Sequence, residues 1–146
     1  MSSGLVICVY KLKTVDNEDI ETVITIASMI EKEARVDEDR AKIASVIYNR
    51  LEQDMPLQLC ATAIYALGYH VDEVLDIHTQ IDSPYNTYYY KGLPVGPISN
   101  PGAPSIIAAL KPEKTDYLFY ILADDNKHYF TNNYDDFLNK KEELGY

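Results

Sequence analysis

One stretch near the middle of the chain, residues 80–102, sets the main limit on the fold. Its sequence, QIDSPYNTYYYKGLPVGPISNPG, is so rich in proline, glycine and tyrosine that no regular helix or strand can run through it. A loop of this length inside a compact domain usually has a function beyond joining two elements. We therefore expect a long structured loop that separates an N-terminal group of helices from the rest of the chain.

The residues before this loop have the spacing of helices. Apolar side chains recur every three or four positions over residues 20–34, which predicts a first helix that begins near Asn17. A second helix is predicted to start after Asp37 and to end before Pro56. A shorter helix is expected over residues 62–67. The N-terminal part of the chain is therefore predicted to contain a helix pair and one short helix.

The residues after the loop mix helix and strand. Pro104 suits the first turn of a short helix that ends at Leu110. Residues 116–123 have the pattern of a buried strand, and residues 127–131 that of its hairpin partner. A final amphipathic helix should extend to about Leu144. Helices, loop, short helix, hairpin and helix in this order predict an α+β fold.

Length and charge narrow the possible partners. A chain of 146 residues suits one domain with its own core. The net charge of −10 argues against a nucleic-acid partner and against contact with an anionic membrane surface. No stretch approaches the ~20 apolar residues of a membrane span, and residues 4–10 are better read as a short strand than as an export signal. The acidic charge of the chain is more compatible with a neutral or weakly charged substrate than with a polyanion.

The sequence carries no metal or cofactor signature. The three histidines lack the spacing of metal ligands. Cys8 and Cys60 form neither a metal motif nor a disulfide framework, and we read them as small buried apolar residues. The residues YKGLPVGP lack the Gly-Lys-Ser/Thr ending of a phosphate loop. We therefore expect no cofactor and no metal ion.

Two glutamates, Glu31 and Glu33, end the first predicted helix. When the helix is projected at about 100° per residue, they fall on opposite shoulders of its apolar face, and Lys32 points to solvent. This spacing predicts that both carboxylates are partly buried, and it does not indicate which of them has a function. Such shoulder carboxylates are commonly satisfied by the backbone or by an arginine, and Arg40 and Arg50 lie on or near the second predicted helix.

Neutral hydrogen-bonding groups and aromatic rings gather in and before the loop. Thirteen tyrosines and no tryptophan provide many flat amphipathic surfaces, which suit sugar rings but are equally common in protein cores. The groups that could hydrogen-bond a sugar are Gln58, Tyr85, Asn86, Thr87 and Tyr88.

Seven blocks of unusual sequence follow one another along the chain. They are ASMIEKEA (27–34), DRAKIASVIYNRL (39–51), MPLQ (55–58), IYALG (64–68), IDSPYNTY (81–88), GLPVGPISNPG (92–102) and ALKPEKTDYLFYILAD (109–124). In this order they resemble the YceG-like family, the bacterial endolytic murein transglycosylases. The likeness runs from about Ile20 to about Leu144, and residues 1–16 lie outside it.

The resemblance implies an activity and a catalytic residue. Family members are expected to cleave MurNAc-β-1,4-GlcNAc bonds inside nascent peptidoglycan strands and to leave 1,6-anhydro-MurNAc ends without consuming water. The catalytic glutamate of the family is the second of a Glu-Lys-Glu triplet, which is Glu33 in this chain. Ordinary glycosidases need two carboxylates. Here one glutamate acts first as acid and then as base, because the C6 hydroxyl of the substrate itself attacks C1.

The resemblance also suggests supporting roles. Gln58, the Tyr85–Tyr88 block and Asn100 are expected to line the sugar cleft, although Asn100 could instead shape the loop. Glu31 and Arg40 are expected to be structural or supporting, with Arg40 either anchoring a loop or pairing with Glu31.

Location and partners follow from the family as well. Full-length members are expected to be single-pass proteins that act at the extracytoplasmic face of the bacterial inner membrane on peptidoglycan strands, with peptidoglycan synthases as candidate partners. We read residues 1–146 as a catalytic domain alone. On this interpretation we expect residues 1–146 to be without the membrane helix and the LysM-like segment of the family, and without an anchor or signal of their own.

One departure from the family leaves other functions open. Where the family usually has Asp-Pro, this chain has Cys60 and Ala61. That change favours the alternative of a non-catalytic module that binds peptidoglycan or holds a synthase. A further alternative is a hydrolase that pairs Glu33 with another acid such as Asp82, and its product would carry a reducing MurNAc instead of an anhydro end.

Overall fold

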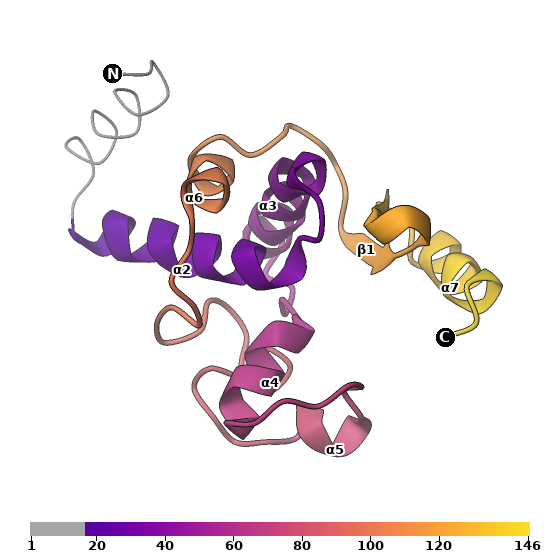
Figure 1. The fold of residues 1–146 in the computed structure, drawn as a ribbon, viewed down its shortest axis with the longest axis horizontal. Helices are drawn as coiled ribbons and strands as arrows, with labels where there is room; N and C mark the ends of the chain where they lie inside the picture. Colours follow the sequence, from indigo (N-terminus) through magenta and orange to yellow (C-terminus); the bar gives the residue numbers. More distant parts are fainter. Residues whose placement is uncertain (1–16) are drawn as a thin grey trace.

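The computed structural model describes residues 17–146 and has a mixed helix and strand architecture (Figure 1). Its elements are α2 (Asn17–Glu33), α3 (Asp37–Glu52), α4 (Cys60–Leu67), α5 (Asp76–Thr79), α6 (Ala103–Leu110), β1 (Phe119–Leu122), the short 3-10 turn η1 (Asp124–Asn126), β2 (His128–Thr131) and α7 (Tyr134–Glu143). This order confirms the predicted α+β fold. The strand expected over residues 4–10 lies outside the described residues. No helix from residue 17 onward is both long enough and apolar enough to cross a bilayer.

Helices α2, α3 and α6 pack against one another and form the core (Figure 1). Apolar side chains of the two long helices fill this core, whereas Val23 and Ile24, near the start of the predicted face of α2, stay half-buried. The fully buried apolar residues on α2 and α3 are Ile26, Ala27, Met29, Ile30, Ile43, Ala44, Val46 and Ile47.

The loop over residues 80–102 is held by hydrogen bonds to α2. The Ser28 hydroxyl accepts from the backbone N–H of Ile98 at 3.0 Å, and the Ser99 hydroxyl donates to the Ser28 carbonyl at 2.9 Å. Because Ser28 is fully buried, these bonds satisfy polar groups that would otherwise lose water without compensation. The loop is therefore a fixed part of the fold, although it has no regular secondary structure.

Strands β1 and β2 pair as an antiparallel hairpin, and α7 packs on it beside the helical core (Figure 1). In the register, Phe119 lies opposite Thr131 and Leu122 opposite His128. The sequence predicted a buried strand over residues 116–123, but β1 is shorter and only half-buried. The reason is that no third strand flanks the hairpin in the described part of the chain.

Polar contacts fix the hairpin to α3. Buried Asp39 accepts a hydrogen bond from the backbone N–H of His128 at 2.8 Å and lies 3.0 Å from the Nδ1 atom of the same residue. Farther along α3, the Asn49 amide donates to the carbonyls of Thr115 and Tyr117 at 3.0 and 2.9 Å. These bonds determine where the C-terminal part of the chain lies relative to the helices.

Candidate active site

A cavity of about 350 Å³ lies where the helical core, the start of α4 and the hairpin with α7 meet. Its walls come from α2 and α3, from residues 57–60 and from the C-terminal elements. The polar and ionisable side chains on these walls include Glu33, Arg50, Gln58, Cys60, Tyr88 and Tyr120.

Glu33 provides the one carboxyl group among the described residues that line this cavity. It is the last residue of α2, and its side chain is half-buried. Burial raises the pKa of Glu33 from an ordinary 4.5 to about 7. A hydrogen bond from the backbone of Ala61 and the positive charge of Arg35 lower this pKa and offset only part of the effect. Near neutral pH, Glu33 can therefore both give and take a proton.

The start of α4 faces Glu33. Ala61 is the second residue of this helix, where a backbone N–H has no partner within the helix, so the N–H is free to bind the carboxylate. Cys60, the first residue, is exposed and lines the cavity, with its sulfur 3.1 Å from the Tyr88 hydroxyl. The prediction that Cys60 is a buried apolar residue is wrong, because α4 starts two residues earlier than expected and presents Cys60 to the cavity.

Arg50 connects the two sides of the cavity. Its Nε donates to the carbonyl of Leu118 at 2.6 Å, and its Nη1 donates to the carbonyls of Pro56 and Leu57 at 2.9 and 3.1 Å. The guanidinium also lies 5.1 Å from the centre of the Phe119 ring. The rigid planar fork of an arginine suits this arrangement better than the single ammonium of a lysine.

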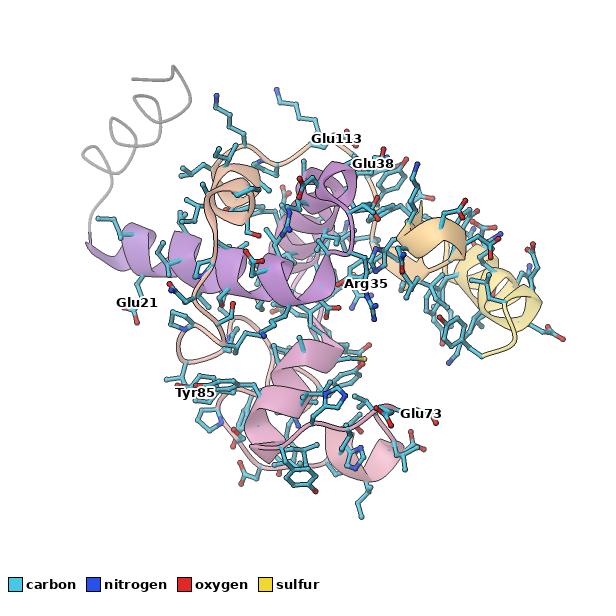
Figure 2. The ribbon with its side chains drawn as sticks, viewed as in Figure 1. Glu21, Arg35, Glu38, Glu73, Tyr85 and Glu113 are labelled. Carbon is cyan, nitrogen blue, oxygen red and sulfur yellow. The ribbon has the colours of Figure 1, made fainter. Side chains whose placement is uncertain are left out.

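Two of the six residues expected to bind substrate, Gln58 and Tyr88, line the cavity. Gln58 adopts a φ of 52°, a left-handed conformation that is uncommon for a side chain of this type. Tyr85 instead packs edge-on against Tyr65 with 4.7 Å between ring centres, in the α4–α5 region away from the hairpin and α7 (Figure 2). Asn100 is exposed and lies outside the cavity lining.

Asn86 and Thr87 are buried beneath the cavity wall. The Asn86 amide donates to the carbonyls of Thr79, at the end of α5, and of Ile81, and its oxygen accepts from the backbone N–H of Tyr88 at 3.0 Å. The Thr87 hydroxyl accepts from the N–H of Leu59 at 3.0 Å and lies 2.7 Å from the Thr62 hydroxyl. The structure therefore places both residues where they support the segments that carry Gln58, Cys60 and Tyr88.

Glu31 lies away from this cavity, at the contact between α2 and α6. Its Oε1 accepts from the backbone N–H of Gly102 at 2.8 Å and from the Ser105 hydroxyl at 3.1 Å. Arg40 lies 3.9 Å from Glu31 and donates to the same serine hydroxyl at 2.6 Å. The Gly102 hydrogen bond, chiefly, lowers the pKa of Glu31, so this carboxylate stays ionised and joins two helices.

Comparison with known proteins now settles the family. Residues 9–143 match the sequence pattern that defines the YceG-like family. This chain belongs to the YceG-like family. It is 49% identical over 123 residues to the endolytic murein transglycosylase of Bacillus subtilis (strain 168), an alignment that covers 84% of this chain and 34% of that protein.

Other YceG-like relatives agree with this assignment. The endolytic murein transglycosylase of Streptococcus pneumoniae (strain D39 / NCTC 7466) is 40% identical over 126 residues, which is 82% of this chain and 23% of that protein. A crystal structure of a YceG-like protein from Listeria monocytogenes matches with a TM-score of 0.82 and 43% identity, over 91% of this chain and 42% of that one. The chain thus spans about a third or less of the curated relatives it matches.

The sequence did not predict that C-terminal residues form one wall of this cavity. The rings of Phe119 and Phe137 stack at 5.5 Å, Tyr134 packs against both, and Lys141 lies on the same side of α7. The apolar spacing of residues 134, 137 and 138 did indicate an amphipathic helix. It could not indicate that this face meets the hairpin beside Glu33.

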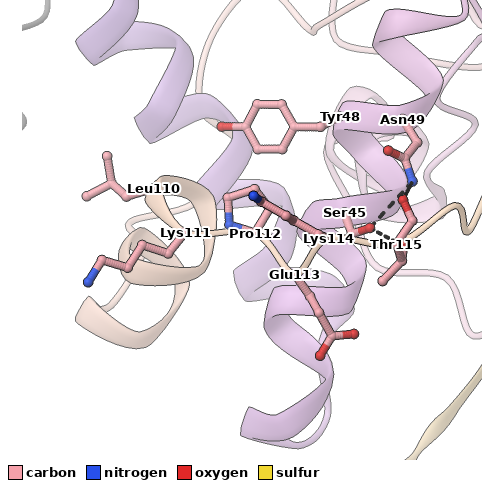
Figure 3. A pocket seen from close by; sticks show the side chains of 9 residues that line it. All are labelled: Ser45, Tyr48, Asn49, Leu110, Lys111, Pro112, Glu113, Lys114 and Thr115. Atoms are coloured by element: carbon pink, nitrogen blue, oxygen red, sulfur yellow. Dashed lines mark hydrogen bonds between the residues drawn. The ribbon is translucent and has the colours of Figure 1, made fainter.

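A second hollow in this YceG-like chain, of about 450 Å³, lies where residues 110–115 cross α3 (Figure 3). Its hydroxyl and amide side chains are already hydrogen-bonded within the protein. Ser45 and Thr115 share a hydroxyl–hydroxyl hydrogen bond, and the Asn49 amide donates to the Thr115 carbonyl. The Tyr48 hydroxyl donates to a carbonyl of α6 at 2.7 Å. We regard this hollow as a packing crevice and the cavity at Glu33 as the functional one.

Proposed function

We propose that this chain is the catalytic part of an endolytic murein transglycosylase that cleaves MurNAc-β-1,4-GlcNAc bonds inside peptidoglycan strands and leaves 1,6-anhydro-MurNAc ends. The observation that carries the proposal is the position of Glu33, a single half-buried carboxyl group with a pKa of about 7 on the wall of a cavity. The relatives from Bacillus subtilis and Streptococcus pneumoniae are both endolytic murein transglycosylases, which supports the same reaction.

One carboxyl group is enough for this chemistry. Protonated Glu33 gives its proton to the glycosidic oxygen as the bond from that oxygen to C1 breaks. The C6 hydroxyl of the same sugar forms the new bond to C1, and the carboxylate of Glu33 takes the hydroxyl proton. The glutamate ends in its starting form, no water is consumed, and the nucleophile needs no separate binding site. A pKa close to the working pH suits a group that acts as both acid and base.

Nearby groups are suited to hold the strand in this reaction. Gln58 and Tyr88 offer neutral hydrogen-bonding groups on the wall of the cavity. Phe119 and Phe137, which also line it, offer apolar rings against which a sugar ring can pack. Asp82, the second acid of the hydrolase alternative, bonds to the Tyr90 hydroxyl and does not line the cavity, which favours the one-carboxylate mechanism.

The setting of the reaction belongs to the same proposal. A murein strand as substrate means that the full-length protein acts in the cell wall. We place its site at the extracytoplasmic face of the membrane, with a peptidoglycan synthase as the partner that supplies nascent strands.

The test is mass spectrometry of peptidoglycan strands after incubation with the wild type, with Glu33→Gln and with Glu31→Gln. We expect new anhydro-MurNAc ends from the wild type, none from Glu33→Gln, and the wild-type product from Glu31→Gln. Glu31 is the matched control because it lies two residues away and bonds to α6 outside the cavity. Anhydro ends from Glu33→Gln would refute the assignment. Binding of strands without new ends from the wild type would favour the non-catalytic module instead.

A further inference from the structure

One buried polar atom on the cavity wall has no hydrogen-bond partner within the described part of the protein. It is the hydroxyl oxygen of Tyr120 on β1, which stands alone in this respect among the side chains of residues 20–146. Buried hydroxyl groups in folded proteins are nearly always satisfied, and an unsatisfied one costs stability. A phenylalanine would fill the same space without that cost, so packing does not explain the hydroxyl group.

The Tyr120 ring is held firmly in place. It packs edge-on against His128, with 5.2 Å between ring centres, and it also contacts Phe130 at 5.7 Å. His128 is in turn bound to buried Asp39. The hydroxyl group cannot turn away to find another partner without disturbing this packing.

Other tyrosines show what a structural hydroxyl does in this fold. The Tyr129 hydroxyl, from the neighbouring strand, donates to Asp136 at 2.7 Å. The Tyr48 hydroxyl donates to the carbonyl of Ala109 at the same distance. Both groups join two elements, whereas the Tyr120 hydroxyl joins nothing.

The surroundings of the Tyr120 hydroxyl are those of the candidate active site. Tyr120 lines the same cavity as Glu33, and the charges of Glu33 and Arg50 both act on its hydroxyl group. Burial, chiefly, holds the pKa of Tyr120 well above its ordinary value, so the group remains a hydrogen-bond donor.

We propose that Tyr120 is a second catalytic residue, whose hydroxyl donates a hydrogen bond to an acceptor oxygen of an N-acetylated sugar bound beside Glu33. The inference rests on the proposed function, because it names a further contact within the same site. The substrate supplies the missing partner, through its acetamido carbonyl or a ring hydroxyl. The cost of the unsatisfied group in the free protein then becomes a gain that is realised only when the strand is bound.

The test compares Tyr120→Phe with the matched control Tyr129→Phe, which removes a hydroxyl from the adjacent strand outside the cavity. We expect Tyr120→Phe to keep or raise the thermal midpoint and to lower the rate of anhydro-end formation by about tenfold, the value of one hydrogen bond. We expect Tyr129→Phe to lower the midpoint and to keep the wild-type rate. A Tyr120→Phe variant with the wild-type rate, or with the stability loss of Tyr129→Phe, would overturn the proposal.

A binding measurement separates this proposal from the proposed function. The affinity for purified glycan strands is compared between Glu33→Gln and the double variant Glu33→Gln/Tyr120→Phe, so that no cleavage is needed. Weaker binding by the double variant supports the role of Tyr120 even if the wild type releases no anhydro ends. Equal affinity of the two variants, or no binding by either, overturns it.

Discussion

The backbone N–H of Ala61, the second residue of α4, faces the carboxyl group of Glu33 at the end of α2 and lowers the pKa of that group. This interaction brings the start of one helix to the end of another and favours the ionised form of the glutamate. The resemblance to the YceG-like family leads us to expect proline at position 61, and proline has no N–H to donate.

Ala61→Pro should therefore raise the pKa of Glu33 above about 7. Proline is tolerated in the first turn of a helix, so we expect the variant to fold. If cleavage starts from protonated Glu33, the decline of kcat/KM on the alkaline side should move to higher pH. The measurement is the pH dependence of kcat/KM for Ala61→Pro and for Ala61→Ser, which keeps the N–H. A profile of Ala61→Pro that coincides with that of Ala61→Ser would contradict the role of this hydrogen bond.

The raised pKa of Glu33 should also appear in the stability of the fold. The folded state holds the proton up to a pKa of about 7, whereas the ordinary value is 4.5. Below pH 4.5 Glu33 is protonated in both the folded and the unfolded state, so it does not lower the free energy of unfolding of the wild type. That free energy falls as the pH rises from 4.5 through 7, because the unfolded state ionises first. Glu33→Gln cannot ionise, so its advantage in the free energy of unfolding should grow from near zero at acid pH to about 3 kcal/mol at alkaline pH. Chemical denaturation over a pH series measures this, and a constant difference would show that Glu33 is not desolvated.

Asp39→Ala should weaken both the fold and the site. It removes the acceptor of two contacts to His128 and leaves a backbone N–H without its partner, which should cost about 2–3 kcal/mol of unfolding free energy. The wall formed by the hairpin and α7 should then be less well placed, and KM should rise. The control is Glu38→Ala, which breaks an exposed ion pair with Lys127 and should cost no more than about 1 kcal/mol. Equal losses from the two variants would mean that the buried contact is no stronger than a surface pair.

Helical periodicity was enough to predict most of the elements, because apolar side chains make up most of the buried faces of α2 and α3. The start of α4 was placed two residues late. Its N-cap position is Leu59, which gives no side-chain hydrogen bond, so the sequence carries no capping signal there.

The candidate site was less accessible to sequence reasoning, because each role depends on contacts between distant segments. Glu31 and Glu33 occupy equivalent shoulders of one helix. Their environments differ because the Glu31 carboxylate accepts a hydrogen bond from Gly102, whereas Glu33 faces the start of α4. In the same way, Tyr88 reaches the cavity while its neighbour Thr87 turns inward to support the segment before α4. The resemblance to a family could indicate Glu33 as the catalytic residue, but no local sequence pattern could predict that Tyr120 lines the same cavity.

The cavity takes its acid from α2 and its opposite wall from β1 and α7. A polypeptide whose synthesis has stopped before α7 therefore carries Glu33 without the surface that would hold a glycan against it. If the domain cleaves murein as proposed, lytic activity begins only once β1 and α7 have both been synthesised, and chains that end earlier lack it.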